Sequence, residues 1–413
     1  MKKLLVIVTF TIIVFSLCSS VFASGVKIDF WYALSGNSGE VFSGMIEEFN
    51  QSQSEVEVNG IYSGKYADTA NKVTAAKASD TLPQGGIIPA GPLFTGAYEN
   101  YKILDYIEKY KFNLAKFYPG TLDYSKYQGK ICVLPFNIST PILYYNKNLF
   151  KKVGLDPEKP PQTWEELKEY GKKLTLDTDN DGNTDIWGLN IKNIDWVFKA
   201  FILQNEGKIM NEDSTEVLFN SPEGLEALRF WKSLTDEGIM PVGLHDLAEK
   251  HFLAGNVGIY LGSSTRLGKW HGQLDFDFGT AFLPKKKTYA VTMGGATVAL
   301  FPSTPEKEEA TWKFIEWLLG SENIAKWSAN TGYIPTTGSA LKTLIIQKLF
   351  LEKPEYKPAF EQLKYVQNYE HFSAMGTLDR TFYEMLDKVE REALTPEEAL
   401  KEAAEIMTED MQQ

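Results

Sequence analysis

A short polar run interrupts an apolar stretch near the middle of the chain and offers groups that could bind a ligand. Leu134–Phe136 and Ile142–Tyr145 are apolar, whereas Asn137–Thr140 between them carries an amide and two hydroxyl groups. Such groups inside a buried strand need hydrogen-bond partners. A ligand can supply them where the backbone passes from one part of a fold to another. The pattern therefore predicts a ligand-binding crossover at Asn137–Pro141.

A second group of residues has the spacing of a calcium loop. Carboxylates stand at loop positions 1, 3, 5 and 9, a glycine stands at the sharp turn, and a backbone carbonyl is available at position 7. These residues are Asp177, Asp179, Asp181, Gly182, Asn183 and Asp185. Position 12 is Gly188 instead of glutamate, so the loop is not an EF-hand, and the alternative is a solvated turn. If a metal binds, we expect structural Ca²⁺ remote from the ligand site, and we expect no other cofactor.

Sequence motifs of the common enzyme classes are missing. The histidines show no HxH or HExxH spacing, and no G-x-S-x-G, Walker A or dinucleotide-binding pattern occurs. Each histidine is interpreted as a surface or satisfied interior residue. Paired carboxylates for glycoside hydrolysis stay open as an alternative, because 54 acidic residues offer many pairs. We expect a protein that is not an enzyme. The histidines are His245, His251, His271 and His371.

Aromatic residues make up 13% of the chain, and several fall where they could flank a ligand. Aromatic faces at loop positions can pack against a sugar or polyol while polar neighbours bind its hydroxyl groups. Trp312, Trp317 and Trp327 instead follow a helical pattern and are predicted core residues. The candidates at predicted element ends, each with core packing as the alternative, are Trp31, Tyr32, Tyr66, Trp196 and Tyr333.

The elements that must position these residues begin with a strand, a helix, a strand and a helix. Val26–Tyr32 and Val56–Tyr62 read as strands, whereas Glu40–Phe49 and Asp68–Ala78 read as helices. This order predicts a parallel sheet that binds ligands beyond the carboxyl ends of its strands. Further strands are predicted at Val257–Leu261 and Thr297–Phe301.

Four later helices are marked by their N-terminal caps. Thr163 and Thr395 are each followed three residues later by a glutamate, which predicts two reciprocal capping boxes. Ser221 and Thr304 each precede a proline, which fits the first turn of a helix.

The N-terminus has the features of a secretory signal peptide. Two lysines precede the apolar run Leu4–Leu17, and small residues follow. We expect cleavage near Ala23. Lipoprotein processing at Cys18 is the alternative, but Leu17 stands where that motif requires a small residue.

The remaining chain is acidic and large enough for two domains by the usual prior of ~150 residues each. The net charge of −12 of the full chain argues against nucleic acid and anionic membrane as partners. Helix N-termini can still bind an anionic small molecule. No later apolar stretch reaches the ~20 residues of a spanning helix, so we expect no direct membrane insertion. Cys132 is the only cysteine after the leader, which excludes an internal disulfide. We expect a monomer.

The chain resembles the extracellular solute-binding proteins of bacterial ABC importers. The main similarity is PFNISTPILYYNKNLFKK at Pro135–Lys152, in which Ile142 replaces the usual small residue. The likeness continues in order through GLDPEKPPQTWEEL, AGNVGIY, MGGATVAL, TGYIPTT and TPEEAL. It covers essentially the whole chain after the leader. Within the family, the pattern is most similar to that of members that bind sn-glycerol 3-phosphate.

This resemblance implies an α/β fold of two lobes, joined by a hinge, with a ligand cleft between them. Lobe 1 would comprise residues 24–138 and 296–331, and lobe 2 would comprise residues 139–295 and 332–413. It also implies location in the periplasm, closure of the hinge on a small-molecule ligand, and delivery of that ligand to the transmembrane subunits of an ABC permease.

The resemblance further implies a set of phosphate-binding residues. They are uncharged hydrogen-bond donors, which suit a phosphate held without a formal counter-charge. The matching positions are Ser139, Ser264, Gly295 and Tyr333. Arg266 is a candidate partner for an anion or a hydroxyl group, with a surface role as the alternative. The other predicted ligand-binding residues are Tyr32, Tyr66, Trp196 and Gly294.

Departures from the family pattern concern the glycerol side of the ligand. Ala90 stands where the family has a glutamate that binds glycerol hydroxyls, Asn193 stands at a second tryptophan position, and residues 371–376 contain no arginine. Losing an acid and an arginine would weaken a polyol subsite by several kcal/mol unless other groups replace them. The predicted ligand is glycerol 3-phosphate or a related glycerophospho compound. The alternatives are an oligosaccharide within the same family and, from another class, a secreted glycosidase or phosphodiesterase.

Overall fold

The computed structural model describes residues 25–89, 102–127, 129–212, 215–270, 272–367 and 375–412. The predicted leader, Ala90, His271 and His371 lie outside the described residues. Within those ranges, none of the helices is both long enough and apolar enough to cross a membrane.

A five-stranded sheet organises one part of the molecule, which we call the five-stranded lobe. Its strand order is β2-β1-β3-β11-β6, in which β1 pairs in parallel with β2 and β3, and β11 pairs antiparallel with β3 and β6. The predicted first two strands are confirmed residue for residue. The strands are β1 (Val26–Tyr32), β2 (Val56–Tyr62), β3 (Gly85–Pro89), β6 (Leu134–Ser139) and β11 (Gly294–Leu300).

A four-stranded sheet organises the other part, the four-stranded lobe. Its order is β10-β7-β9-β8, with β8 parallel to β9 and the other pairs antiparallel. Its strands are β7 (Pro141–Asn146), β8 (Trp187–Ile191), β9 (Val257–Ser263) and β10 (Phe278–Ala281). A separate hairpin consists of β4 (Lys126–Tyr127) and β5 (Lys130–Ile131).

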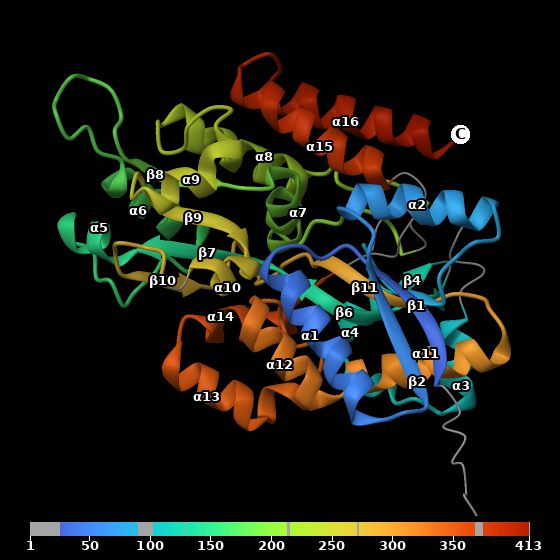
Figure 1. The fold of residues 1–413 in the computed structure, drawn as a ribbon. Helices are drawn as coiled ribbons and strands as arrows, with labels where there is room; N and C mark the ends of the chain where they lie inside the picture. The colour runs from blue at the N-terminus through green and yellow to red at the C-terminus, as the bar shows by residue number, and fades with distance from the viewer. Residues whose placement is uncertain are drawn as a thin grey trace, which may run out of the picture.

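Helices cover both sheets (Figure 1). The early helices are α1 (Asn37–Ser52), α2 (Tyr66–Ala78), α3 (Ile103–Lys109), α4 (Pro119–Asp123), α5 (Lys147–Lys152), α6 (Trp164–Leu174), α7 (Ile194–Gln204) and α8 (Pro222–Asp236). The later ones are α9 (Ala248–Leu253), α10 (Leu267–Trp270), α11 (Pro305–Leu318), α12 (Ser321–Thr331), α13 (Leu344–Glu352), α14 (Tyr356–Glu361), α15 (Met375–Glu390) and α16 (Pro396–Met411). Short 3₁₀ helices are η3 (Leu114–Lys116), η4 (His245–Leu247), η5 (Ser264–Arg266), η6 (Ala340–Lys342) and η7 (Gln362–Tyr365).

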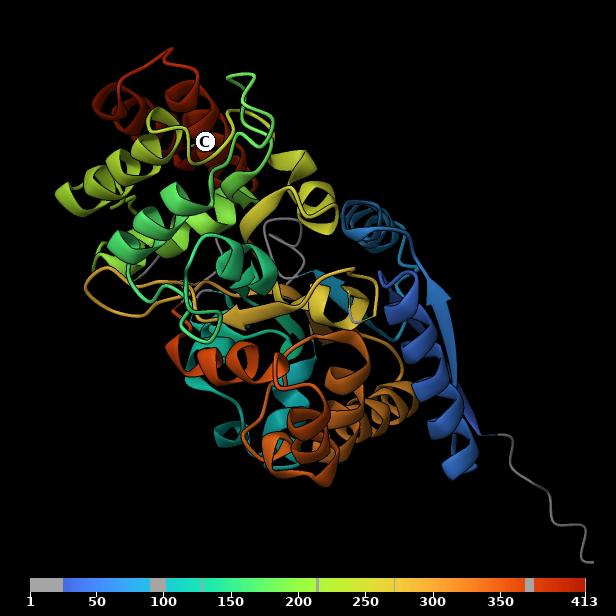
Figure 2. The ribbon, with the colours of Figure 1, turned by 90° about the vertical axis from the view of Figure 1, so that its left-hand side faces the viewer.

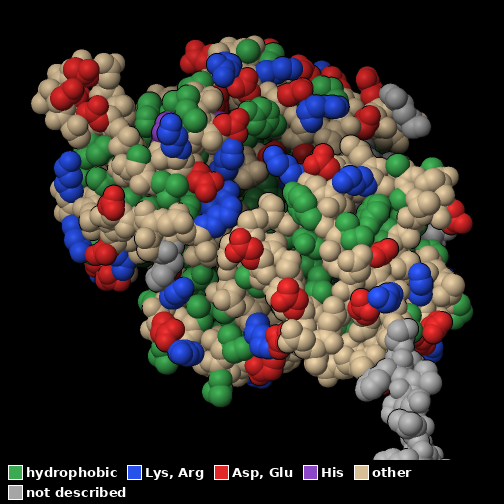
Figure 3. All heavy atoms as spheres, viewed as in Figure 1, with side chains coloured by type: hydrophobic (Ala, Val, Ile, Leu, Met, Phe, Trp, Pro, Cys, Tyr) green, Lys and Arg blue, Asp and Glu red, His purple; other side chains and the backbone are tan. Residues whose placement is uncertain are grey.

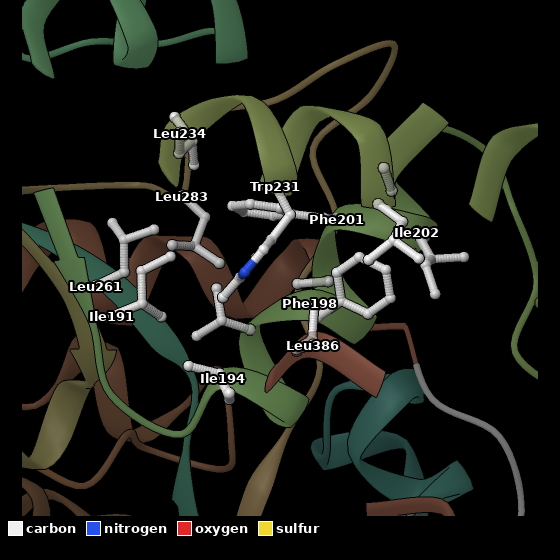
Figure 4. Packing of buried hydrophobic residues seen from close by; sticks show 14 of the residues in the cluster. Ile191, Ile194, Phe198, Phe201, Ile202, Trp231, Leu234, Leu261, Leu283 and Leu386 are labelled. Carbon is white, nitrogen blue, oxygen red and sulfur yellow. The ribbon is translucent and has the colours of Figure 1, made fainter. Parts of the chain in front are cut away.

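Each lobe has its own apolar core. In the five-stranded lobe, α1 and α11 pack on the sheet, and Trp312 and Trp327 are 1% and 0% exposed, as predicted for core residues. Trp317 is only partly buried. In the four-stranded lobe, α7, α8 and α15 bring Phe198, Trp231 and Leu386 together (Figure 4). A further core joins the other face of β7 and β9 to α9, α10 and α12–α14. Seen from the side, α15 and α16 lie far from α1 (Figure 2).

The predicted caps form, with one correction. Ser221 and Thr304 each accept a hydrogen bond from the third residue of their helix. Thr395 forms the complete capping box with Glu398. At α6 the reciprocal box is wrong: Thr163 accepts from the Glu166 amide, but the Glu166 carboxylate accepts from the Gln162 amide at 2.7 Å. The preceding backbone is extended and bridged to Lys285, so the carboxylate reaches one residue further back.

Candidate functional site

The predicted crossover joins the two lobes. β6 ends at Ser139 in the five-stranded sheet, and β7 begins at Pro141 in the four-stranded sheet, so Thr140 alone separates them. The Thr140 carbonyl accepts a hydrogen bond from the Ser264 amide at 2.9 Å. The backbone therefore changes lobe at the position that the polar run predicted.

Two other segments meet the chain at this crossover. Gly294, the first residue of β11, pairs with Ser139. The Ile334 amide, just after α12, donates a hydrogen bond to the Ile138 carbonyl at 2.7 Å. Three stretches that are far apart in sequence are thus hydrogen-bonded to one another where the sheets join.

The alternation of β6 separates core residues from site residues. Leu134, Phe136 and Ile138 belong to the apolar cores. Asn137 and Ser139 lie on the opposite face, because successive side chains of a strand point in opposite directions. Gly294, which pairs with Ser139 on β11, has no side chain and leaves room above this face.

Trp196 occupies the room above Gly294. A Cβ atom added at Gly294 would lie 3.0 Å from Cζ2 of the indole, so the ring lies against the bare backbone. The Thr292 hydroxyl donates to the Trp196 carbonyl at 3.2 Å and fixes the first turn of α7 beside β11. Gly295 has a φ of 120°, and a Cβ there would lie 1.9 Å from the Asn137 carbonyl oxygen, so only glycine fits.

Tyr66 reaches the same face from the start of α2. Its hydroxyl accepts a hydrogen bond from Asn137 Nδ2 at 3.0 Å. Burial raises the pKa of Tyr66 well above its usual range, and the neighbouring hydroxyls of Tyr333 and Tyr124 raise it further. Tyr333 is held by stacking on Trp327, with ring centroids 5.5 Å apart. At neutral pH the Tyr66 phenol therefore carries its hydrogen.

Several buried polar atoms at the crossover have no partner within the described part of the chain. They are Asn137 Oδ1, Ser264 Oγ and Trp196 Nε1. Asn137 and Ser264 are each 0% exposed. A buried polar atom without a partner costs about 1–3 kcal/mol, so native proteins rarely keep one without a reason. We call Tyr66, Asn137, Ser139, Trp196, Ser264 and Tyr333 the crossover cluster.

Two predicted ligand-binding residues make their contacts elsewhere. Tyr32 packs in the core of the five-stranded lobe, where its ring meets Phe42 and its hydroxyl bonds Ser43 Oγ at 3.3 Å. Arg266 forms an ion pair with Glu249 at 2.9 Å. Its side chain is 17% exposed, and its role in ligand binding stays a prediction. Both side chains have contacts within a lobe, but Arg266 Nε has no hydrogen-bond partner in the described residues.

The aspartate loop is only partly assembled as a metal site. Carboxylate oxygens of Asp177, Asp179 and Asp185 lie within 4.8 Å of one another, and all three residues are exposed. Asp181 instead accepts from the amide and the side chain of Asn183. Hydrogen bonds from Thr178 lower the pKa of Asp185. Calcium binding stays a prediction, which titration calorimetry of chelator-treated protein would test.

The surface is hollowed between the lobes. Figure 3 shows this hollow over the region where α7 lies in Figure 1, with acidic and basic side chains near its rim. A separate open cavity of about 660 Å³ lies between the end of α4 and the loop after α7, and Asp123, Leu203 and Thr288 contribute to its lining.

Sequence reasoning placed the crossover correctly but gave two of its residues no role. Asn137 belonged to the polar run, and its signal was an amide within an apolar strand. Tyr124, next to Tyr66, carries no local signal, because the contact depends on the tertiary fold. His245 is a satisfied interior histidine, as predicted, with Nδ1 3.1 Å from the Ile191 carbonyl oxygen and Nε2 2.8 Å from Glu390.

Comparison with known proteins gives consistent similarities. The family model for bacterial extracellular solute-binding protein matches residues 44–357. The sn-glycerol-3-phosphate-binding periplasmic protein UgpB of Salmonella typhimurium is 28% identical, covering 81% of this chain and 80% of that protein. UgpB of Escherichia coli K12 is 27% identical over the same shares.

Solved structures agree with the fold. The cyclic alpha-maltosyl-1,6-maltose binding protein of Arthrobacter globiformis has a TM-score of 0.84 at 25% identity, covering 94% of this chain and 99% of that one. UgpB of Mycobacterium tuberculosis in complex with glycerophosphocholine has a TM-score of 0.80 at 23% identity, with the same coverage. The two-lobed α/β fold is therefore shared with binding proteins for chemically different solutes.

Proposed function

Because this chain belongs to the bacterial extracellular solute-binding proteins, we propose that it binds sn-glycerol 3-phosphate or a related glycerophospho compound at the crossover cluster. As a solute-binding protein of this family it serves as the substrate-binding component of an ABC importer. We further propose that it works in the periplasm after removal of its leader and passes the ligand to the permease. The proposed lobes are residues 24–138 with 296–331, and residues 139–295 with 332–413.

One observation carries the choice of ligand. The crossover cluster contains hydroxyl, amide and indole groups, and three of its buried polar atoms have no partner in the described residues. Two of these atoms, Ser264 Oγ and Trp196 Nε1, are hydrogen-bond donors, and Tyr66 stays protonated because burial raises its pKa. Neutral donors suit the oxygens of a phosphate group without a counter-charge.

The proposed mechanism uses the crossover as a hinge. Ser139 pairs with Gly294 where the five-stranded sheet meets the junction, and Ile334 is bonded to the same strand. A small backbone rotation there would move one lobe against the other as a rigid body. A ligand with better contacts in the closed form would shift the population toward closure. The permease would then meet the closed, loaded form.

An oligosaccharide is the second candidate, and the aromatic residues favour it. The Trp196 indole lies at the cluster, and the Tyr333 and Trp327 rings are stacked nearby. Aromatic faces of this kind pack against sugar rings. Asn193, exposed at the start of α7, lacks the second ring of the glycerophosphate pattern. Relatives in the fold include a maltosyl-maltose binding protein.

A thermal-shift screen followed by calorimetry tests the proposal. Glycerol 3-phosphate, glycerophosphodiesters and malto-oligosaccharides would be added to the purified protein at equal concentrations. A ligand that binds only the native state adds about 2.7 kcal/mol of stability at 100 times its Kd. We expect the glycerophospho compounds to raise the melting temperature. Stabilisation by oligosaccharides alone would support the second candidate, and sustained hydrolysis of chromogenic glycosides or phosphodiesters would contradict both.

The matched control for this screen is Tyr383→Phe. Tyr383 lies on α15, is 46% exposed and is remote from the cluster contacts described above. The Tyr383→Phe variant should bind ligand like the natural protein. Tyr66→Phe removes a hydroxyl from the cluster and should lose affinity.

A further inference from the structure

Asn137 is a fully buried amide in a strand that otherwise alternates between core and site. It is 0% exposed, and its Nδ2 donates to the Tyr66 hydroxyl at 3.0 Å. Its Oδ1 has no partner within the described part of the chain. Keeping such an amide costs stability, so its contact with Tyr66 needs a functional reason.

The direction of this hydrogen bond decides what Tyr66 can do. A phenol has one hydrogen and an oxygen that accepts. When Asn137 fills the acceptor position, the phenol hydrogen must go to another oxygen. If the amide were turned by 180°, its Oδ1 would accept that hydrogen, and Tyr66 would have none to offer a ligand.

The surroundings of Tyr66 agree with the donor role. Burial raises the pKa of Tyr66, so the hydrogen is retained at neutral pH. The Tyr333 hydroxyl is its neighbour, and each phenol group has one hydrogen to donate. The two phenols carry two hydrogens, and only one of these can lie in a hydrogen bond between the two phenol oxygens. The other phenol hydrogen is therefore left for a third oxygen. Hydrogen bonds arranged head to tail strengthen one another.

We propose that Asn137 is a positioning residue that holds Tyr66 by its oxygen, so that a phenol hydrogen of the Tyr66 and Tyr333 pair points to an anionic oxygen of the ligand. This inference rests on the proposed function, because it assigns the recipient of that hydrogen as an acceptor-only phosphate oxygen. A sugar hydroxyl can adjust by rotating its own hydrogen, whereas a phosphate oxygen cannot.

The test is a double-mutant cycle on Asn137 and Tyr66. The variants are Asn137→Leu, Tyr66→Phe and the pair together, and calorimetry measures their affinity for the glycerophospho compound that the natural protein binds. We expect each single variant to lose about tenfold in affinity, the effect of one hydrogen bond. The double variant should match Tyr66→Phe within about threefold, because residues that act through one another are not additive.

Asn190→Leu provides the matched control. Asn190 is the corresponding fully buried asparagine of the four-stranded lobe, on β8, and its side chain bonds the Leu244 carbonyl and the Ile191 amide. It should lose stability as Asn137→Leu does, but its ligand affinity should stay within about twofold of the natural protein. This comparison separates a positioning role from a general loss of packing.

Asn137→Asp adds a measurement of ligand affinity that would not change in this way if Asn137 had only a structural role. Aspartate has the same shape, but an ionised carboxylate only accepts and would take the Tyr66 hydrogen. Affinity for the phosphate ligand should fall at least about 100-fold, because a donor is lost and a negative charge is added. Affinity for any neutral saccharide that binds should change far less.

Four outcomes decide the inference. A folded Asn137→Leu that binds like the natural protein, or losses that add in the double variant, would overturn it. If Asn137→Leu does not fold, Asn137→Ser replaces it in the cycle and is judged by the same rule. If the natural protein binds no glycerophospho compound, the proposed function fails. The cycle is then run with the oligosaccharide that binds, where coupling supports the positioning role and additivity overturns it.

Discussion

Two buried polar networks in this protein differ in whether their atoms have partners. The Glu390 network, at the end of α15, is complete: the carboxylate lies 2.7 Å from Trp231 Nε1, 2.8 Å from His245 Nε2 and 3.1 Å from the Gly243 amide. The other His245 nitrogen faces the Ile191 carbonyl. In the crossover cluster, by contrast, Asn137 Oδ1 and Ser264 Oγ have no partner in the described residues.

The difference separates a structural network from a binding site. The Glu390 network ties α8 and α15 to the end of β8 inside one lobe, beside the apolar residues of Figure 4. Its groups satisfy one another, so a ligand has nothing to add. The crossover cluster lies where the lobes meet, and its unpaired atoms leave bonds for a ligand to complete. Both groups of residues are buried and polar. They differ in whether their polar atoms have hydrogen-bond partners.

The largest expected effect comes from opening the complete network. Glu390→Ala removes the acceptor of Trp231 and of the Gly243 amide and leaves His245 without its carboxylate. Each buried donor left without its acceptor costs about 1–3 kcal/mol, and this variant leaves several. Chemical denaturation should show this loss, and ligand affinity of the folded fraction should be unchanged. Glu390→Gln, which keeps an acceptor, should lose less, and a loss below about 1 kcal/mol in Glu390→Ala would contradict the comparison.

Removing the indole from the cluster should give the next largest effect. Trp196→Ala should reduce ligand affinity by at least about 2 kcal/mol, as for other aromatic anchors of a binding surface. Because Trp196 is only partly buried, we expect a smaller loss of stability. Trp317→Ala, on α11 and also partly buried, is the control and should not change affinity. A large fall in melting temperature with unchanged affinity would assign Trp196 to the core instead.

Ser264→Ala should have opposite effects on stability and on binding. Its unpaired hydroxyl costs free energy in the absence of ligand, so removing it should leave stability unchanged or raise it by up to about 1 kcal/mol. Affinity should fall by about 1–3 kcal/mol. Ser125, equally buried, donates to the Thr121 carbonyl at 3.2 Å, so Ser125→Ala should lose stability and keep affinity. If Ser264→Ala and Ser125→Ala changed stability and affinity in the same way, the distinction between paired and unpaired buried polar groups would be contradicted.

The smallest expected effect is on pH dependence. Burial raises the pKa of Tyr66, so its phenol stays protonated above the usual range and affinity should be flat from about pH 7 to pH 9. A phosphate monoester should bind more weakly below about pH 6, where it loses its second charge, whereas a diester should not. Calorimetry at several pH values measures both. A fall in affinity near pH 8.5 that disappears in Tyr66→Phe would contradict the protonated phenol.

Local patterns predicted what depends on neighbouring residues. Alternation identified β1 and β2 with their observed ends, and Thr395 formed the capping box that its spacing indicated. The polar run within an apolar strand identified the change of lobe at Thr140. In each case the partner atoms lie within a few residues or on the same strand, so spacing alone describes the geometry.

Contacts between distant residues were beyond the reach of sequence patterns. Asn137 and Tyr66 are 71 residues apart, and His245 and Glu390 are 145 apart. Arg266 was assigned to the ligand because it follows Ser264, but the fold brings Glu249 to its guanidinium. Tyr32 ends a strand as predicted, yet α1 supplies Phe42 and Ser43 and draws it into the core. Which polar group finds a partner is settled by the tertiary fold, not by residue type.

The position of β11 has a consequence for how the chain can fold. β11 lies between β3 and β6, although its residues, Gly294–Leu300, follow those strands by more than a hundred positions. In a nascent chain that has reached β6, β3 therefore has one unpaired edge and β6 has no partner strand in the five-stranded sheet. Exposed edges recruit foreign strands, and pairing over such sequence distances is slow. Until Leu300 has been synthesised, the edges of β3 and β6 stay open to pairing with a foreign strand.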